Sequence, residues 1–296
     1  MPFYFLVFHG VCKEKMSDRV MRDLFHEFGV AAYHARGILG QGVSMMVIDT
    51  GCGKGHGLAV SSIISDGIAP DANIDLADVI DPSSIPIDSV IDAIKRAIDL
   101  DVDIISISLG TEDAFGPMQD VLRDAHDRGI LVFAAAGNSG ERGYEFPAAY
   151  DRVISVASIN SARQPSLFNT RNDAVAVFAP GENIRLSMSS EVFSGTSFAT
   201  PFAAGLAALV LSERRSLEPR KVPIRLSRRE MVATLRNQDH LNLNCEDHTF
   251  AVDGPSCFGG GPPRKAIEKE SSIQVPIAFA MLVLLLCAGA WVIRNS

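Results

Sequence analysis

The sequence predicts an α/β protein of three layers, in which helices cover both faces of a mostly parallel sheet. Short apolar runs rich in Val, Ile and Ala alternate with helical patterns along the chain, as in β-α-β units. These runs are apolar at nearly every position, which is typical of strands that are buried on both faces. The predicted strands are 43–48, 74–80, 104–109, 130–135, 153–157 and 174–178.

Apolar residues at helical spacing predict the helices between these strands. The clearest patterns cover residues 87–98 and 118–125, and a long run rich in Ala and Leu over 197–213 predicts a central helix. A helix over 228–235 is expected to close the domain. Near the N-terminus, residues 14–28 predict an amphipathic helix that a glycine ends.

The bulk composition limits the class of protein. With 296 residues, of which 47% are hydrophobic, the chain is long enough for one large domain with a sizeable core. The formal net charge is −8 and there is no long basic run, which disfavours a nucleic-acid partner. The five cysteines form no CxxC or Cys/His metal spacing, so no structural zinc site is expected. Cys245 and Cys257 would pair in an oxidising compartment and stay reduced in the cytoplasm, and both alternatives remain open.

The chain divides into four segments. Residues 1–28 are a short N-terminal extension, 29–240 the main domain, 241–272 a loop and linker, and 273–293 a transmembrane helix. The last segment has 21 residues and no charge. At about 1.5 Å per residue, a helix of that length spans about 30 Å, the thickness of the hydrocarbon core of a bilayer.

The flanking charges predict how this helix is oriented. Arg264, Lys265 and Lys269 precede it and only Arg294 follows, which places the main domain in the cytoplasm by the positive-inside rule. The apolar run 1–8 has no basic residue before it and no small-residue cleavage site after it. It is therefore predicted to be a strand, not a secretory signal. We expect a single-pass membrane protein with a C-terminal tail anchor.

Three polar residues lie where an open α/β sheet places its reactive groups, at strand ends and helix starts. Asp49 ends the strand 43–48, His56 begins a helix, and Ser197 begins the long central helix. Alone, these residues would be a turn former, a surface histidine and a helix cap. Together they meet the needs of a nucleophilic serine, which requires a base to remove its proton and a carboxylate to orient that base.

Around these positions the sequence resembles the subtilisin-like serine peptidases, whose triad has the same chain order of Asp, His and Ser. Residues 42–51 resemble the strand of the family's aspartate, and residues 56–60 the start of its histidine helix. Residues 194–201, SGTSFATP, nearly match the nucleophile motif, and residues 134–138 match the segment of the oxyanion asparagine. Supporting matches follow in the family's order at 67–70, 107–110 and 179–181.

The resemblance covers about residues 29–240 and implies the roles of four residues. Ser197 would attack the peptide carbonyl, His56 would take the serine proton and pass it to the leaving amine, and Asp49 would orient His56. The side-chain amide of Asn138 and the backbone N–H of Ser197 would bind the oxyanion at the N-terminus of a helix.

The resemblance also implies where substrate binds. Ser108, Leu109 and Gly110 are expected to form an exposed strand edge to which the substrate adds as a further strand. Ala136 and Gly137, just before the oxyanion asparagine, are expected to contact substrate as well.

A further substrate contact is expected at Glu145, because it precedes Phe146 and Pro147, a position that lies near the floor of the primary pocket in relatives. A carboxylate there would favour Lys or Arg on the acyl side of the cleaved bond. The alternative is a glutamate in an exposed loop.

The sequence departs from the family pattern in several places. Only six residues separate Asp49 from His56. An extended segment of that length reaches about 20 Å, far more than a hydrogen bond between the two side chains requires. Leu58 and Ala59 replace the family's Thr and second His, and Thr111 replaces a second Gly. Cys52, close to Asp49, is either a small buried residue or a source of thiol sensitivity. The extension 1–28 is too short for the usual propeptide and is interpreted as its remnant, a lid or part of the domain.

The sequence thus predicts a membrane-tethered serine endopeptidase acting on peptides or proteins. Two alternatives stay open: a catalytically inactive module that binds peptides, and a ligase or cyclase that uses the same triad. No cofactor is expected. Family members often bind calcium, but no cluster of ligands is specific enough to place an ion. The natural substrate and the oligomeric state are not indicated.

Overall fold

A parallel sheet of six strands forms the centre of the computed structural model, which describes residues 26–52, 55–79, 87–186, 189–217 and 225–237. The strands lie in the order β2-β1-β3-β4-β5-β6, and each neighbouring pair is parallel. Every strand overlaps one predicted run, which confirms the mostly parallel sheet. The strands are β1 (Ser44–Asp49), β2 (Asn73–Asp78), β3 (Ile104–Ile107), β4 (Leu131–Ala135), β5 (Ile154–Ile159) and β6 (Val175–Pro180).

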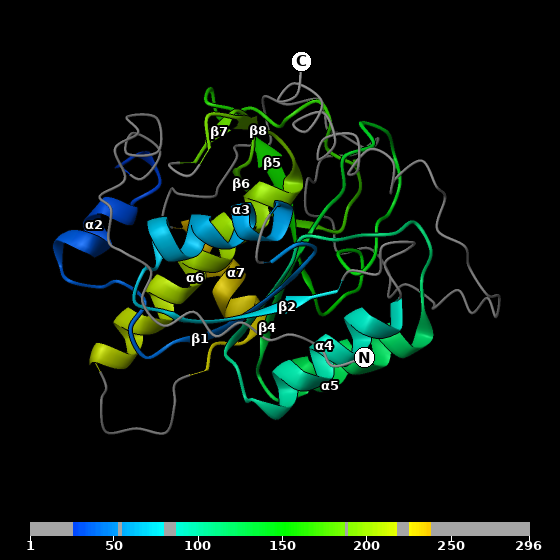
Figure 1. Cartoon of the computed structure of the whole chain (residues 1–296), viewed down its shortest axis with the longest axis horizontal. Coiled ribbons are helices and arrows are strands. Elements are labelled where there is room, and N and C mark those ends of the chain that lie inside the picture. Colours follow the sequence, from blue (N-terminus) through cyan, green and yellow to red (C-terminus); the bar gives the residue numbers. More distant parts are fainter. Residues whose placement is uncertain (1–25, 53–54, 80–86, 187–188, 218–224, 238–296) are drawn as a thin grey trace, which may run out of the picture.

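Helices cover both faces of this sheet, as predicted. In β1, Met45 and Val47 belong to one buried cluster, whereas Met46 and Ile48 belong to another, because successive side chains of a strand point to opposite faces. Figure 1 shows the resulting three layers. One face carries α3 (His56–Ser62), the π-helix η1 (Ile63–Ile68) and α6 (Thr196–Leu217), and the other carries α4 (Ile87–Asp99) and α5 (Gly116–Asp127).

Four further elements lie around this core. They are α2 (Val30–Ala35), α7 (Arg228–Asn237) and a small antiparallel pair of strands, β7 (Ile184–Arg185) and β8 (Val192–Phe193).

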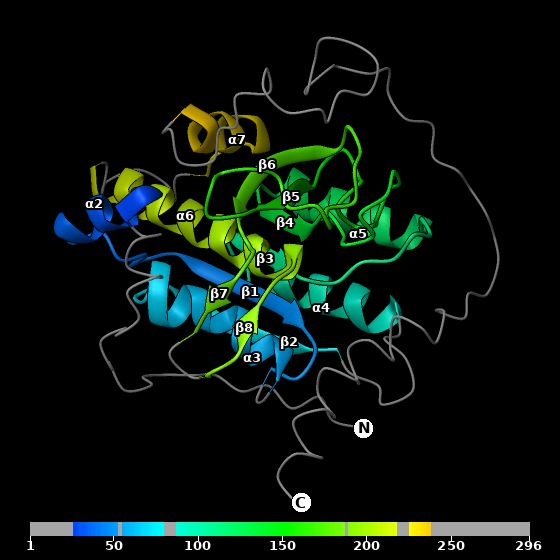
Figure 2. The same ribbon diagram turned by 90° about the horizontal axis from the view of Figure 1, so that it is seen from above.

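The long helix α6 is the central helix that the composition predicts. It lies along the sheet (Figure 2) and contacts β3, β4, β5 and β6. Its small residues allow close packing: a Cβ added at Gly205 would lie 3.0 Å from the side chain of Ile68 in η1. By length and composition α6 is apolar enough to cross a membrane, but most of its apolar residues are buried in the protein.

Several predictions concern residues outside the described part of the chain. These are the strand at 1–8, most of the helix at 14–28, the linker 241–272 and the transmembrane helix 273–293. The pairing of Cys245 with Cys257 also falls there and stays a prediction.

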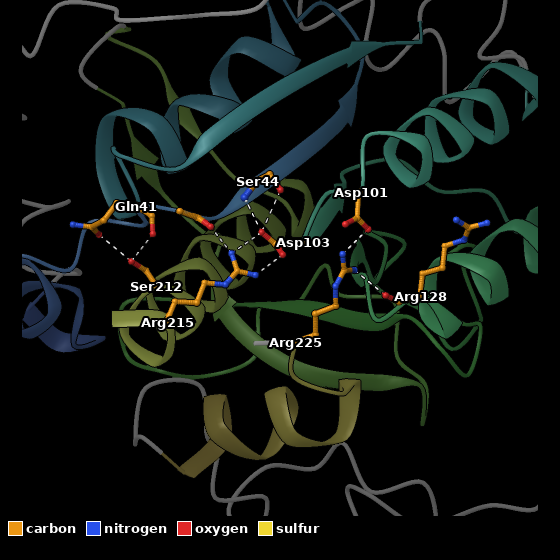
Figure 3. Close-up of polar contacts among 9 residues, drawn as sticks. Gln41, Ser44, Asp101, Asp103, Arg128, Ser212, Arg215 and Arg225 are labelled. Atoms are coloured by element: carbon orange, nitrogen blue, oxygen red, sulfur yellow. Dashed lines mark hydrogen bonds and ion pairs between the residues drawn. The ribbon is translucent and has the colours of Figure 1, made fainter. Parts of the chain in front are cut away.

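A largely buried ion pair ties the C-terminal end of α6 to the edge where the strands begin (Figure 3). Arg215 forms a bidentate pair with the carboxylate of Asp103, the residue before β3. The same carboxylate accepts hydrogen bonds from the backbone N–H of Ser44 at 2.9 Å and from its hydroxyl at 3.2 Å. Because Ser44 begins β1, this pair joins α6, β1 and β3. Nearby, Arg225 pairs with Asp101 in the same region of the surface.

Loss of the Asp103 charge should destabilise the fold. The side chains of Asp103 and Arg215 are only 8% and 18% exposed, and removing one partner leaves the other charge without compensation. We expect Asp103→Asn to lower the free energy of unfolding by about 2–4 kcal/mol, measured by urea denaturation.

The matched control is Asp92→Asn, which breaks an ion pair with Lys95 whose two side chains are each 60% exposed. It should change the free energy of unfolding by about 0.5 kcal/mol or less. Equal effects of the two substitutions would contradict a stabilising role for the buried pair.

Candidate active site

The candidate site lies where the order of the sheet reverses. From β1 the chain goes to β2 on one side and then to β3 on the other, so the carboxyl ends of β1 and β3 flank a topological switch point, where open α/β sheets bind ligands. Asp49 is the last residue of β1, and Ser108 directly follows β3.

Asp49 is fully buried, with 0% exposure. Its Oδ1 accepts a hydrogen bond from the backbone N–H of Thr50 at 2.6 Å and lies 2.8 Å from Nδ1 of His56. Its Oδ2 is also buried and has no hydrogen-bond donor within the described part of the protein. A buried carboxylate with so few donors interacts strongly with a neighbouring imidazolium.

A backbone hydrogen bond brings the start of α3 close to Asp49, despite the short spacing between Asp49 and His56. The backbone N–H of Gly57 donates to the carbonyl of Thr50 at 2.7 Å, which folds the start of α3 back against the end of β1. A Cβ at Gly57 would lie only 2.7 Å from that carbonyl oxygen. Glycine is therefore required at this close approach, and the six intervening residues do reach, as predicted.

The environment of His56 changes its basicity. Burial lowers the pKa of His56, whereas the charge of Asp49 and the hydrogen bond to Asp49 raise it. The two raising effects together outweigh burial, so the pKa of His56 lies above its ordinary value of 6.5. With Nδ1 bonded to Asp49, Nε2 remains as the nitrogen that can accept a proton from a serine.

Cys52 lies beside this pair and is 4% exposed. Burial and the charges of Asp49 and Asp78 raise the pKa of its thiol. A thiol with a raised pKa has little reactive thiolate, so the interpretation as a small buried residue is favoured over thiol sensitivity.

Ser197, the second residue of α6, is held by Ser108 through two hydrogen bonds. The hydroxyl of Ser108 donates to the carbonyl of Ser197 at 2.9 Å, and the hydroxyl of Ser197 donates to the carbonyl of Ser108 at 3.3 Å. Pro201 explains the first bond. Proline has no N–H to give to the carbonyl four residues earlier, and that carbonyl belongs to Ser197, so the hydroxyl of Ser108 replaces the missing donor.

Asn138 is fixed beside the same helix start. Its Oδ1 accepts hydrogen bonds from the backbone N–H of Thr196 at 2.9 Å and from the hydroxyl of Thr196 at 3.0 Å. The hydroxyl of Thr196 in turn accepts from the N–H of Gly137 at 3.2 Å. With the oxygen used in this way, the Nδ2 group of Asn138 is the part of the amide that remains for an incoming ligand.

The ring of His56 packs edge-on against Phe198, with 5.4 Å between ring centroids. Because Phe198 follows Ser197, the imidazole lies beside the start of α6. Within the described residues, no hydrogen bond joins His56 to Ser197, whose hydroxyl points to Ser108. A rotation about the Cα–Cβ bond of Ser197 redirects this hydroxyl, and catalytic hydrogen bonds often tighten only when substrate binds.

The predicted substrate edge needs correction at Ser108. This residue is 5% exposed, and its side chain is used to hold α6. Leu109 and Gly110 are partly exposed, but the strand β3 ends at Ile107, before them. The expected exposed edge therefore does not include Ser108.

The backbone groups of the two residues before Asn138 are bonded within the protein. Ala136 is 1% exposed, and its N–H donates to the carbonyl of Val156 at 2.9 Å. The N–H and the carbonyl of Gly137 are bonded to Thr196 and Thr170. The backbone groups of these residues are thus largely used inside the protein, and their contact with substrate stays a prediction.

Sequence reasoning missed three residues of the site. Thr196 orients Asn138, Thr170 donates to the carboxylate of Glu145 at 2.9 Å, and Phe198 packs against His56. Thr196 and Phe198 belong to the nucleophile motif, so the motif was the available signal. Across the residues that the structure describes, no three His, Cys, Asp or Glu side chains are grouped to hold a metal ion.

Comparison with known proteins agrees with this geometry. The model of a family described as the subtilase family, Peptidase_S8, matches residues 48–245. The chain is 31% identical to the thermostable alkaline protease of Halalkalibacterium halodurans, over 66% of this chain and 63% of that protein. It is also 31% identical to the major intracellular serine protease of Bacillus subtilis, over 68% of this chain and 77% of that protein. It thus spans less than two thirds of the first relative.

Two solved structures are similar in fold. The self-cleaved protease domain of PatA superposes with a TM-score of 0.57 at 25% identity, over 65% of this chain and 85% of that one. A lanthipeptide protease superposes with a TM-score of 0.63 at 21% identity, over 74% of this chain and 86% of that one.

The hydrogen bond from Ser108 to Ser197 should affect turnover. We expect Ser108→Ala to lower kcat about 10-fold with little change in KM. The lost hydrogen bond positions Ser197, and its absence should raise the activation free energy by about 1.4 kcal/mol. Ser108→Thr keeps a hydroxyl and should restore part of the turnover. Ser106→Ala is the control, since the Ser106 hydroxyl is buried on the preceding strand without a partner among the described residues. Equal losses at the two positions would contradict a positioning role for Ser108.

The raised pKa of His56 predicts the pH dependence of activity. His56 accepts a proton only when it is neutral, so kcat/KM for an uncharged peptide should fall as the pH falls through the raised pKa. The midpoint of this acid limb is expected above 6.5, the ordinary pKa of histidine. In Asp49→Asn the midpoint should move down, and kcat should fall about 10⁴-fold. A wild-type midpoint below 6.5 would show that Asp49 does not outweigh burial.

Proposed function

The chain belongs to the subtilase family, and we propose that it is a serine endopeptidase that cleaves peptide bonds through an acyl-enzyme on Ser197. The main support for this proposal is the 2.8 Å contact between the buried carboxylate of Asp49 and Nδ1 of His56. This pair lies beside the start of α6, which contains Ser197. A carboxylate, an imidazole and a serine in that relation form the arrangement that activates a hydroxyl.

In the proposed reaction, Ser197 Oγ attacks the carbonyl carbon of the peptide and His56 Nε2 takes the hydroxyl proton. The imidazolium then forms next to Asp49, which stabilises its charge. His56 returns the proton to the leaving amine, and the C–N bond breaks. Water, deprotonated by His56, hydrolyses the ester on Ser197 and frees the acid.

Asn138 and the start of α6 are proposed to stabilise the tetrahedral intermediate. Asn138 Nδ2 and the backbone N–H of Ser197 donate to the oxyanion, and the N-terminus of α6 adds a positive dipole end. The fixed orientation of the Asn138 amide supports this role, because Thr196 holds its oxygen through two hydrogen bonds. The donor is thus oriented before substrate arrives.

We also propose that residues 273–293 tether the peptidase to a membrane. Support comes from the sequence alone: 21 uncharged residues follow a stretch that contains Arg264, Lys265 and Lys269. Tethering raises the concentration of the enzyme near substrates on the same membrane, so membrane-associated proteins are the proposed substrates. If the full chain is released from membranes by alkaline carbonate as readily as a variant ending at residue 272, the tether is wrong.

The proposed peptidase is tested with internally quenched peptides and mass spectrometry of the products. Wild type should release products that have gained one water, and Ser197→Ala should release none. Ligated or cyclic products would instead identify a transpeptidase. Binding of peptides without any product, in folded wild type, would identify an inactive module.

Two substitutions of Asn138 separate its catalytic role from its structural one. Asn138→Asp keeps an oxygen for Thr196 but loses the N–H donor, whereas Asn138→Ala loses both. We expect kcat to fall at least about 10²–10³-fold in both variants. Only Asn138→Ala should also lower the melting temperature appreciably. Near-normal turnover of Asn138→Asp would exclude the amide as an oxyanion donor.

A further inference from the structure

Two segments beside the candidate site are joined to each other at both ends. At one end, an antiparallel bridge joins Thr111 to Phe146 through two backbone hydrogen bonds, of 2.9 Å and 2.7 Å. At the other end, the hydroxyl of Tyr150 donates to the carbonyl of Phe115 at 2.9 Å and accepts from the N–H of Phe115 at 2.8 Å. The rings of Phe146 and Tyr150 lie 4.7 Å apart between centroids. Residues 111–115 are thus fixed at their first and last positions.

Tyr150 can fix the neighbouring segment because it is itself held in the core. Its side chain belongs to the buried cluster on the face of α4 and α5, and the residue is 7% exposed. Burial raises the pKa of the Tyr150 hydroxyl, although its bond to Phe115 lowers this pKa in part, so the hydroxyl keeps the proton that it donates.

The chain before Tyr150 is also folded on itself. The N–H of Ala149 donates to the carbonyl of Glu145 at 2.8 Å, and the N–H of Tyr150 donates to the carbonyl of Pro147 at 3.1 Å. Glu145 is half-buried, so it is not the exposed loop residue of the alternative interpretation, and its contact with substrate stays a prediction. Residues 145–150 therefore form a compact turn that presents the Tyr150 hydroxyl in one place.

The segment that Tyr150 fixes runs beside the nucleophile. Ser108 is bonded to Ser197 through its hydroxyl and its carbonyl, so the chain that follows Ser108 leaves the sheet next to Ser197. The middle of the segment is exposed at Glu112 and Asp113. Exposed residues have few packing contacts to order them, so the position of the segment depends on the bonds at its two ends.

We propose that Tyr150 is a positioning residue for peptide binding, which holds residues 109–115 ready for a peptide that lies against Ser197. This inference rests on the proposed peptidase function. Without the hydroxyl, the segment would become ordered only when the peptide binds, and this loss of conformational entropy would weaken binding. The contact between Asp49 and His56 does not involve Tyr150, so the chemical step should be unaffected.

The first arm of the test compares two substrates of different size. An internally quenched octapeptide extends well past the reacting bond, whereas p-nitrophenyl acetate does not. We expect Tyr150→Phe to raise KM for the octapeptide about 5-fold to 20-fold, as for the loss of a buried hydrogen bond, with kcat within about 2-fold of wild type. For the ester, kcat/KM should stay within about 2-fold. A purely structural defect would lower both activities alike, once active-site titration and circular dichroism have established the folded concentration.

Tyr144→Phe is the matched control. It removes a hydroxyl that donates to Asp173 at 2.8 Å from a residue that is 43% exposed. We expect both substrates to be cleaved within about 2-fold of wild type. An unchanged KM for the octapeptide in Tyr150→Phe, an equal loss with the ester, or an equal effect of Tyr144→Phe would overturn the role of Tyr150.

Hydrogen exchange tests the ordering of the segment directly. The N–H of Phe115 is bonded to the Tyr150 hydroxyl, so its exchange should be about 10-fold faster or more in Tyr150→Phe. The amides of β3 should keep their rates, because a local opening leaves the core closed. An unchanged rate at Phe115 would contradict the proposal.

Binding without chemistry separates this inference from the peptidase proposal. In the Ser197→Ala background, Tyr150→Phe should weaken binding of the octapeptide about 5-fold to 20-fold. If wild type cleaves no peptide but this loss of affinity is seen, the peptidase proposal fails while the role of Tyr150 in peptide binding stands. If Tyr150→Phe binds as tightly as its parent, or the parent does not bind the octapeptide, the role of Tyr150 is overturned.

Discussion

The hydrogen bond between Asp49 and His56 is the interaction on which the site depends. The Asp49 carboxylate has 0% exposure, so it depends on neighbouring donors; those in the described structure are the backbone N–H and hydroxyl of Thr50 and the imidazole of His56. The charge of Asp49 and its hydrogen bond to His56 therefore favour the protonated form of the imidazole. This hydrogen bond forms because β1 ends at the switch point of the sheet and Gly57 lets α3 begin directly beside that end.

The helix α6 holds Ser197 near His56, because both ends of the helix are fixed to the sheet. At its C-terminal end Arg215 pairs with Asp103, before β3. At its N-terminal end, Ser108, after β3, bonds to the carbonyl that Pro201 leaves without a donor. The same strand therefore anchors both ends of the helix. In the proposed reaction, a serine held in this way loses little entropy when it aligns with substrate.

Much of the fold follows from the sequence, because buried parallel strands and amphipathic helices have distinct periods. The end of β3 did not follow. The sequence predicts Ser108 to be one more strand residue. Only its hydrogen bond to Ser197, 89 residues later, shows that its side chain holds the start of α6. The motifs located Asp49, His56, Asn138 and Ser197, but not how Thr196 orients Asn138. Nor did they show that Ala136 is buried and bonded to Val156, since such contacts depend on tertiary packing.

We propose that His56 and Asp49 make Ser197 uniquely nucleophilic. Peptide mapping after reaction with a fluorophosphonate tests it most directly, because the reagent bonds its phosphorus to an activated serine oxygen with loss of fluoride. We expect one adduct, on the peptide that contains Ser197, and its loss in a folded His56→Ala variant. An adduct on another serine, or none on Ser197 in folded wild-type protein, would contradict it.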